Sequence, residues 1–279
     1  MKYSILRRLG VILLIMGIAL AVPVYAEKPV GRSMMGGKNG DLSVSFGAEY
    51  TTGDYGTGTD TTIWYFPLSF SYGDEVTTFS VTVPYLIVEG PGNVTPAVGD
   101  GMGWGGMGDM QVVRPGPVGA TRTESGLGDV VLSGSMRLVA EAPTHPRIDL
   151  TGKIKLATAD EDDNLGTGEN DYAVQLDLEK GMFFGYLGYR IYGDPPGINL
   201  DNVAYGLVGL SRPLDSATRA GVSLYAQQAA AAGADNPLEL SLFLSRKLNK
   251  DSRLRPYMMF GLSDSSPDWG VGVTLSLYR

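Results

Sequence analysis

The sequence predicts an all-β fold, an antiparallel up-and-down transmembrane β-barrel of about 12 strands, within a range of 10 to 14. Three observations lead to this prediction. Apolar and polar residues alternate with period two in runs of about ten residues along most of the chain. After residue 26, no stretch approaches the roughly 18 consecutive apolar residues of a membrane helix. Short and long connections alternate between the runs, as they do when strands cross between two compartments.

The first 26 residues are expected to be removed as a signal peptide. Three cations lie within residues 1–8, residues 9–21 are apolar, and Val24-Tyr25-Ala26 resembles a cleavage box of small residues. An apolar segment of 13 residues is shorter than the roughly 20 needed to cross a bilayer, which favours cleavage over a membrane anchor. The predicted organisation is a cleaved signal peptide (1–26), a short N-terminal segment (27–40) and the barrel domain (41–279).

Each predicted strand is justified by its alternation. In residues 41–50 every second residue is apolar, and serine, glycine and glutamate lie between them. Similar runs follow at 64–72, 79–87, 130–138, 148–156 and 172–178. The contrast is weaker at 183–191, 202–212, 220–226, 238–244, 254–262 and 269–277, and in 202–212 either face could be the apolar one. Runs of this length suit tilted strands that cross a bilayer.

The connections separate two ends of the predicted barrel. Short turns fall at 73–75, 141–147, 180–181, 213–217 and 249–252, whereas the connections at 51–60, 89–125, 159–170, 194–201, 229–237 and 263–268 are mostly longer. Short periplasmic turns opposite long external loops are typical of outer-membrane barrels. We therefore expect a monomer in the outer membrane of a Gram-negative-type bacterium, reached by signal-peptide-dependent export and the barrel-assembly machinery. Its surroundings would be outer-membrane lipid and lipopolysaccharide.

Composition excludes several other classes of function. The chain has no cysteine and one histidine, and its pI near 4.7 argues against a nucleic-acid partner. His145 lies between prolines in a short inner turn, away from any candidate nucleophile. The acidic run 160–163 is interpreted as a solvated loop tip in preference to a cation site. We expect no enzymatic activity, no cofactor and no metal.

The polar face of the strands would line the lumen. It supplies the candidate site residues Arg137, Asp149, Lys153, Lys155, Asp177, Glu179, Arg190, Arg219, Glu239 and Lys247. These charges could form a pore wall that binds or filters a solute, or they could form ion pairs that close a modest barrel. In the glycine-rich connection 89–125, Met102, Trp104 and Met107 are candidates for an apolar constriction, and a flexible external loop is the alternative.

Three short motifs resemble one family. They are Ser125-Gly126-Leu127-Gly128-Asp129-Val130, the strand with Lys153, Lys155 and Leu156, and Gly166-Thr167-Gly168 with Asp171. This pattern resembles outer-membrane transporters of the phenol-degradation meta-pathway (MetA-pathway) type. The resemblance implies passage of small molecules, aromatic or hydrophobic ones among them, so a channel or facilitator is the first hypothesis. The alternatives are a structural or surface-interaction barrel with a closed lumen, and a secreted soluble β-sandwich with its apolar face inward.

Overall fold

The structure is a computed structural model that describes residues 41–96, 111–113, 120–197 and 199–279. These residues form strands, turns and loops. In this part of the chain no helix is long and apolar enough to cross a membrane. The predicted signal peptide (1–26), the segment 27–40 and the constriction candidates Met102, Trp104 and Met107 lie outside the described residues.

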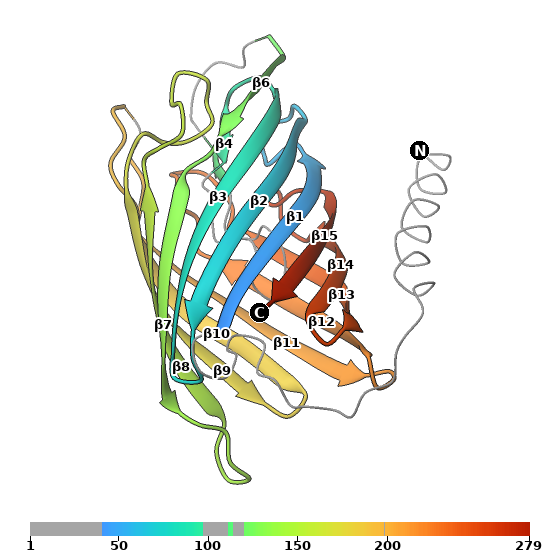
Figure 1. The fold of residues 1–279 in the computed structure, drawn as a ribbon. Coiled ribbons are helices and arrows are strands. Elements are labelled where there is room, and N and C mark those ends of the chain that lie inside the picture. Colours follow the sequence, from blue (N-terminus) through green and yellow to red (C-terminus); the bar gives the residue numbers. More distant parts are fainter. Residues whose placement is uncertain (1–40, 97–110, 114–119, 198) are drawn as a thin grey trace.

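The strands follow one another up and down along the chain (Figure 1). The first half contains β1 (Asp41–Gly53), β2 (Thr61–Gly73), β3 (Thr77–Gly90), β4 (Val94–Pro96), β5 (Gln111–Val113), β6 (Arg122–Leu127), β7 (Val130–Val139) and β8 (Arg147–Leu156). The second half contains β9 (Asp171–Lys180), β10 (Phe183–Ile191), β11 (Val203–Pro213), β12 (Thr218–Gln227), β13 (Leu238–Asn249), β14 (Ser252–Gly261) and β15 (Trp269–Tyr278). The twelve wall strands overlap the twelve predicted ones.

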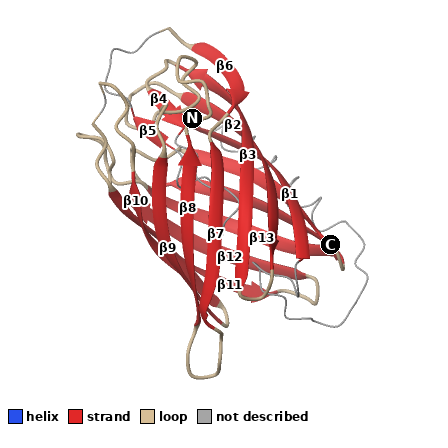
Figure 2. Ribbon diagram, turned by 60° about the vertical axis from the view of Figure 1, so that its left-hand side comes forward, coloured by secondary structure: helices blue, strands red, loops and turns tan. Residues whose placement is uncertain are grey.

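The sheet closes on itself as a 12-stranded antiparallel barrel. Successive strands pair, and β1 pairs with β15 from Ser43↔Tyr278 to Thr52↔Trp269. Strand β3 pairs with β7 through its first half and with β6 through its second half, so β6 and β7 together form one position of the wall. Closure gives each wall strand two neighbours, which satisfies the backbone groups that an open edge would leave unpaired (Figure 2).

Apolar side chains cover the outside of the barrel. Phe46, Phe79, Leu187 and Val208 are 53%, 63%, 65% and 67% exposed, and their neighbours along each strand point inward. In the run 202–212, where the sequence left the outward face open, β11 has Tyr205 buried on the inner face and Val208 on the outer face. Apolar-out alternation in a closed barrel is the reverse of the β-sandwich alternative, which required an apolar core between two sheets.

The prediction that residues 89–125 form one long loop is wrong at both ends. Glu89 and Gly90 belong to β3, and β6 pairs with them as an extension of the wall. The sequence of β6 shows no apolar alternation, because it holds a single large apolar residue, Leu127. Farther along, β4 pairs with β5, and the Asn164 amide donates to the Val94 carbonyl at 2.7 Å. The start of this connection is therefore packed against the connection that follows β8.

Candidate functional site

One side of the lumen brings together most of the predicted carboxylates near the short-turn end. The guanidinium of Arg147 lies 2.6 Å from Asp149 and 4.0 Å from Glu179, and Arg137 lies 3.6 Å from Asp149. Asp177 accepts hydrogen bonds from the Thr151 hydroxyl at 2.7 Å and from the Gln175 amide at 2.6 Å. We call this set on β7, β8 and β9 the carboxylate wall: Arg137, Arg147, Asp149, Asp177 and Glu179. Two guanidinium groups therefore lie among three carboxylates in this wall.

The side formed by β12, β13 and β14 is basic. Arg219 donates to the Ser211 carbonyl and hydroxyl at 3.3 and 2.9 Å, and Arg253 donates to the Ser245 hydroxyl at 3.4 Å. Lys247 is the ladder partner of Arg253, and Arg255 follows two residues later on the same face of β14. We call these four cations the basic wall: Arg219, Lys247, Arg253 and Arg255. Across β10 to β15, all of which the structure describes, Glu239 is the sole carboxylate.

The two walls face each other across the barrel. Going around the closed sheet, β8 and β14 are separated by the same number of strands in either direction. Figure 2 shows β7, β8 and β9 crossing in front of β11, β12 and β13. The electrostatic interaction of Arg219 with Glu179 joins the two sides. A solute in this part of the lumen would therefore experience a transverse electric field.

Aromatic rings line the inner face of β10 to β14. Phe184, Tyr205, Tyr225 and Phe243 are buried together with Leu207, and Tyr186 and Tyr257 pack against them. We call this set the aromatic wall: Phe184, Tyr186, Tyr205, Tyr225, Phe243 and Tyr257. The Tyr205 hydroxyl donates to Gln175 and the Tyr257 hydroxyl to Glu49, so the polar tips are satisfied while the rings stay on the wall.

Glycines on the neighbouring strands make room for these rings. A Cβ on Gly209 would lie 2.2 Å from Phe184, and one on Gly221 would lie 2.2 Å from Phe243. The same relation holds for Gly188 with Tyr205 and for Gly272 with Tyr257, each at 2.4 Å. Each ring therefore lies against the glycine of its ladder partner, which keeps the ring close to the backbone.

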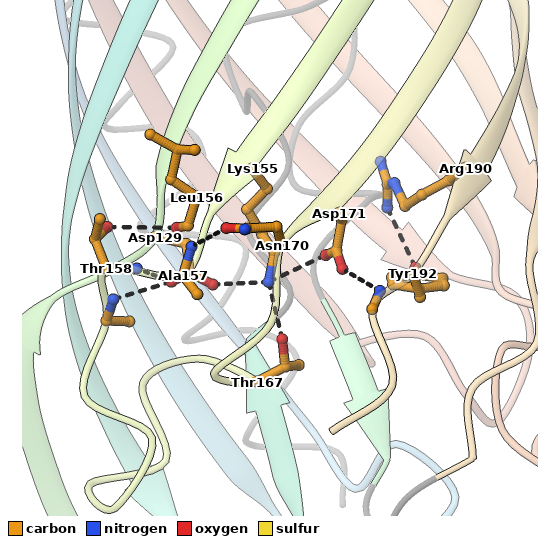
Figure 3. A network of polar contacts seen from close by, with 12 residues as sticks. Asp129, Lys155, Leu156, Ala157, Thr158, Thr167, Asn170, Asp171, Arg190 and Tyr192 are labelled. Atoms are coloured by element: carbon orange, nitrogen blue, oxygen red, sulfur yellow. Dashed lines mark hydrogen bonds and ion pairs between the residues drawn. The ribbon is translucent and has the colours of Figure 1, made fainter. Parts of the chain in front are cut away.

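At the opposite, long-loop end, a buried ammonium joins several segments (Figure 3). Lys155 Nζ lies 2.8 Å from Asp129 Oδ2 and 3.0 Å from Asp171 Oδ2, and it donates to the Thr167 hydroxyl at 2.9 Å. Asp129 also accepts hydrogen bonds from the backbone N–H groups of Thr158 and Ala159. We call Asp129, Lys155, Thr167 and Asp171 the mouth network. These four residues belong to the motifs that carried the family resemblance, and the network brings those three motifs together in space.

The mouth network continues toward the next connection. Asp171 Oδ1 accepts a hydrogen bond from Gly193 N–H at 3.0 Å. Arg190 donates to the Tyr192 hydroxyl at 3.3 Å and lies over the rings of Tyr192 and Tyr205. Lys155 and Arg190, both predicted as lumen-lining, are therefore part of a packed collar at the mouth.

The remaining predicted residues are dispersed. Lys153 faces inward on β8 between the mouth network and the carboxylate wall, and Glu239 is buried near the outer end of β13. Within the acidic run, the Asp160 carboxylate accepts hydrogen bonds from the backbone N–H groups of Asp162 and Asp163, as a turn residue does. Among the described residues, no three histidine, aspartate or glutamate side chains form a group able to hold a metal ion.

The fold has solved counterparts. The structure of the COG4313 outer membrane channel from Pseudomonas putida F1 is similar with a TM-score of 0.66 and 12% sequence identity, covering 91% of this chain and 100% of that chain. The KdgM porin follows with a TM-score of 0.47 and 10% identity over 84% and 98% of the two chains. The CymD monoaromatic hydrocarbon channel has a TM-score of 0.45 and 8% identity over 88% and 89%. No protein-family model matches the sequence, and no curated protein matches it. At these identities the first similarity establishes the barrel fold.

Proposed function

We propose that the protein is a monomeric outer-membrane channel through which small molecules pass passively. One observation carries the proposal: a closed barrel presents large apolar side chains outward and a charged, hydroxyl-rich and aromatic face inward. An apolar exterior on this scale would be unstable in water, whereas it suits the hydrocarbon region of a bilayer. A polar interior then has a use as a solute path.

The proposed location in the outer membrane follows from the same apolar outer surface. Tyr50 packs against Trp64 and Trp269 toward the long-loop end of β1, β2 and β15, where amphipathic rings suit the headgroup region. Outer-membrane lipid and lipopolysaccharide would surround this apolar surface, after export directed by residues 1–26 and insertion by the barrel-assembly machinery. A closed barrel has no exposed edge strand, which is consistent with a monomer.

The proposed solutes are small molecules that include aromatic or hydrophobic ones. The aromatic wall supports this choice, because its two partly buried rings, Tyr186 and Tyr257, lie beside the carboxylates of Asp177 and Glu49. Membership of the phenol-degradation meta-pathway type of transporter is part of the proposal, supported by the motif residues that meet in the mouth network.

A structural barrel with a closed lumen is the second candidate. Three charged side chains of the inner face, Glu49, Asp149 and Glu239, are at most 5% exposed. Side chains that pack this closely against one another could fill the interior.

Two measurements separate the candidates. A folded barrel should migrate faster in SDS gels before boiling than after, and identical migration would contradict insertion as a barrel. Protein that passes this test is then added to planar bilayers. The channel proposal expects step-like increases in conductance, and folded protein that gives no current would establish the closed-lumen alternative. Liposome swelling with sugars, amino acids and aromatic acids would rank the solutes.

A further inference from the structure

The connection between β8 and β9 is held at both of its legs. On the first leg, the Asp129 carboxylate accepts hydrogen bonds from Thr158 N–H at 3.0 Å and from Ala159 N–H at 2.9 Å. On the second leg, the Thr167 hydroxyl accepts one from the Lys155 ammonium at 2.9 Å. Both anchoring residues, Asp129 and Lys155, are buried. The connection therefore has a fixed position relative to the wall.

The segment between the two legs closes on itself as a turn. Leu165 N–H donates to the Asp160 carbonyl and Asn164 N–H donates to the Glu161 carbonyl, each at 3.0 Å. Asn164 has a φ of 58°, in the left-handed region that asparagine adopts more readily than most residues. The side chains of Asn164 and Leu165 are buried, whereas Glu161 is exposed. The turn thus directs two consecutive side chains into the molecule.

Leu165 lies inside the barrel. It belongs to one apolar cluster with five wall residues: Ile63, Tyr65, Leu86, Val88 and Val131. The wall residues of this cluster alternate with outward-facing ones such as Trp64 and Tyr85, so they face the lumen. A Cβ on Gly126, the ladder partner of Leu86, would lie 2.8 Å from the Leu165 side chain. A side chain packed on the inner faces of β2, β3, β6 and β7 lies within the space that these strands enclose.

The start of the connection after β3 meets the same turn. The Asn164 side-chain amide donates to the Val94 carbonyl at 2.7 Å, and its oxygen accepts a hydrogen bond from the Thr95 hydroxyl. Val94 and Thr95 are buried. Figure 2 shows β4 and β5 at the long-loop end of the barrel. The Asn164 amide therefore joins two connections at the mouth.

We propose that the connection between β8 and β9, together with β4, forms an inward-folded constriction, and that Leu165 and Asn164 are the residues that hold it in the lumen. Leu165 anchors the connection on the inner wall through apolar contacts, and the Asn164 amide fixes β4 to it. The inference rests on the proposed channel function, in which this constriction would set the size of the largest solute that can enter.

The packing of the constriction is tested without relying on conductance. The chain has no cysteine, so a Thr95→Cys, Asn164→Cys variant carries two thiols. In the barrel refolded in detergent and shown to be heat-modifiable, a short bis-methanethiosulfonate reagent should link them, and mass spectrometry should recover the linked peptides before reduction. Thr95→Cys, Ala232→Cys is the control, because Ala232 is exposed and the connection after β12 lies across the ring from β3. Equal linking of both pairs, or no linking, would overturn the packing.

Two variants test whether the constriction limits the solutes. Leu165→Ser places a hydroxyl in the apolar cluster, and Asn164→Gly keeps the left-handed conformation but removes the amide. Both should raise the conductance and admit larger sugars in liposome swelling. In Asn164→Gly, loss of two buried hydrogen bonds should also speed amide exchange in β4 by about 10- to 100-fold.

Leu262→Ser is the matched control for Leu165→Ser. Leu262 is exposed in another outer connection, so this change should alter neither the conductance nor the size limit. Leu165→Ser, Asn164→Gly and Leu262→Ser all leave the charge unchanged, so the reversal potential in a KCl gradient across a planar bilayer should stay the same. Equal conductance and equal size limits in Leu165→Ser and Leu262→Ser would overturn the constriction.

The linked variant separates failure of the constriction from failure of the channel. Before linking, Thr95→Cys, Asn164→Cys lacks the amide and should conduct like Asn164→Gly, and linking should return the conductance to that of the unmodified barrel. Linking that leaves the conductance and the size limit unchanged would uphold the channel and refute the constriction. If linking occurs but no variant carries current, the channel is refuted, and with it the size limit. An unmodified barrel without current whose Leu165→Ser variant conducts would uphold the constriction and refute passage through the unmodified barrel.

Discussion

Replacing Lys155 by methionine tests whether the mouth depends on a buried ammonium. Lys155 Nζ lies 2.8 Å from Asp129 and 3.0 Å from Asp171, and the three side chains are 5%, 0% and 7% exposed. Methionine has a similar length and no charge, so it would leave two buried carboxylates without their cation. The change should destabilise the barrel and loosen the connections that follow β8 and β10.

The magnitude follows from what compensates the two carboxylates. Removing one partner of a buried ion pair costs about 3–5 kcal/mol. Asp129 would keep its hydrogen bonds from Thr158 and Ala159 N–H, and Asp171 would keep the one from Gly193. These bonds favour the lower end of the range, about 3 kcal/mol of unfolding free energy.

The assay is urea unfolding of the barrel refolded in lipid vesicles, with limited proteolysis of the outer connections as a second readout. Lys250→Met is the matched control, because its ion pair is exposed and should contribute less than about 1 kcal/mol. Adding Asp129→Asn to Lys155→Met removes one of the two carboxylates left without a cation and should restore part of the lost unfolding free energy. A Lys155→Met barrel that unfolds within about 1 kcal/mol of the unmodified one would refute the reasoning.

Three other perturbations have defined outcomes. Gly209→Val places a Cβ about where Phe184 lies, so it should lower the free energy of unfolding in urea by about 1–3 kcal/mol. Gly152→Val, with open space around its Cβ, should lower it less. Equal losses in the two variants would contradict the ring–glycine contact. Asp149→Asn leaves Arg137 and Arg147 without their shared carboxylate and should shift the reversal potential further toward anions; a shift toward cations would contradict the assignment of this wall to the lumen. Backbone N–H groups of Thr77 and Val76 lower the pKa of Asp74, and that of Ala217 lowers the pKa of Asp215, both from 3.8. The hydrogen bonds to these two carboxylates stabilise the folded barrel fully above the unfolded-state pKa, and this stabilisation is lost as pH falls through the folded-state pKa. The Asp74→Asn, Asp215→Asn variant should therefore lose less stability between pH 5 and pH 2 than the unmodified barrel. An unchanged acid profile would contradict this.

The strand pattern could be predicted because lipid imposes it. A strand between lipid and a polar lumen must alternate, so residues 148–156 were sufficient to identify β8, observed as Arg147–Leu156. The facing of β11 could not be predicted, because the aromatic wall places Tyr205 and Leu207 on the inner face while Val208 and Leu210 are on the outer one. Where the lumen is itself apolar, alternation loses its contrast.

The site was only partly predictable for a different reason. The inward direction of Arg219 and Lys247 follows from alternation within one strand. Strand β14 has the same alternation, with Arg253, Arg255 and Tyr257 on one face and Leu254 and Pro256 on the other. The predicted run 254–262 rests on apolar residues and therefore begins after Arg253. The mouth network combines residues from three segments, and the Lys155–Asp129 contact spans 26 positions, which no local pattern reports.

The two charged regions of the barrel have separable roles. In the mouth network, oppositely charged groups neutralise one another at 2.8 to 3.0 Å and join segments of the chain, so their effect is on stability. In the basic wall, four cations share one face and two of them, Arg219 and Arg253, are hydrogen bonded to serines, so their effect is on the potential in the lumen. Lys155→Met should therefore lower the urea midpoint with a small change in reversal potential, because the removed charge lies in a buried network at the mouth, at the opposite end of the barrel from the basic wall. Arg253→Gln should shift the reversal potential with a small change in urea midpoint, because glutamine can still hydrogen bond to Ser245. If both variants changed both quantities alike, stability and selectivity would depend on one continuous network, and the division between mouth and inner lumen would have to be abandoned.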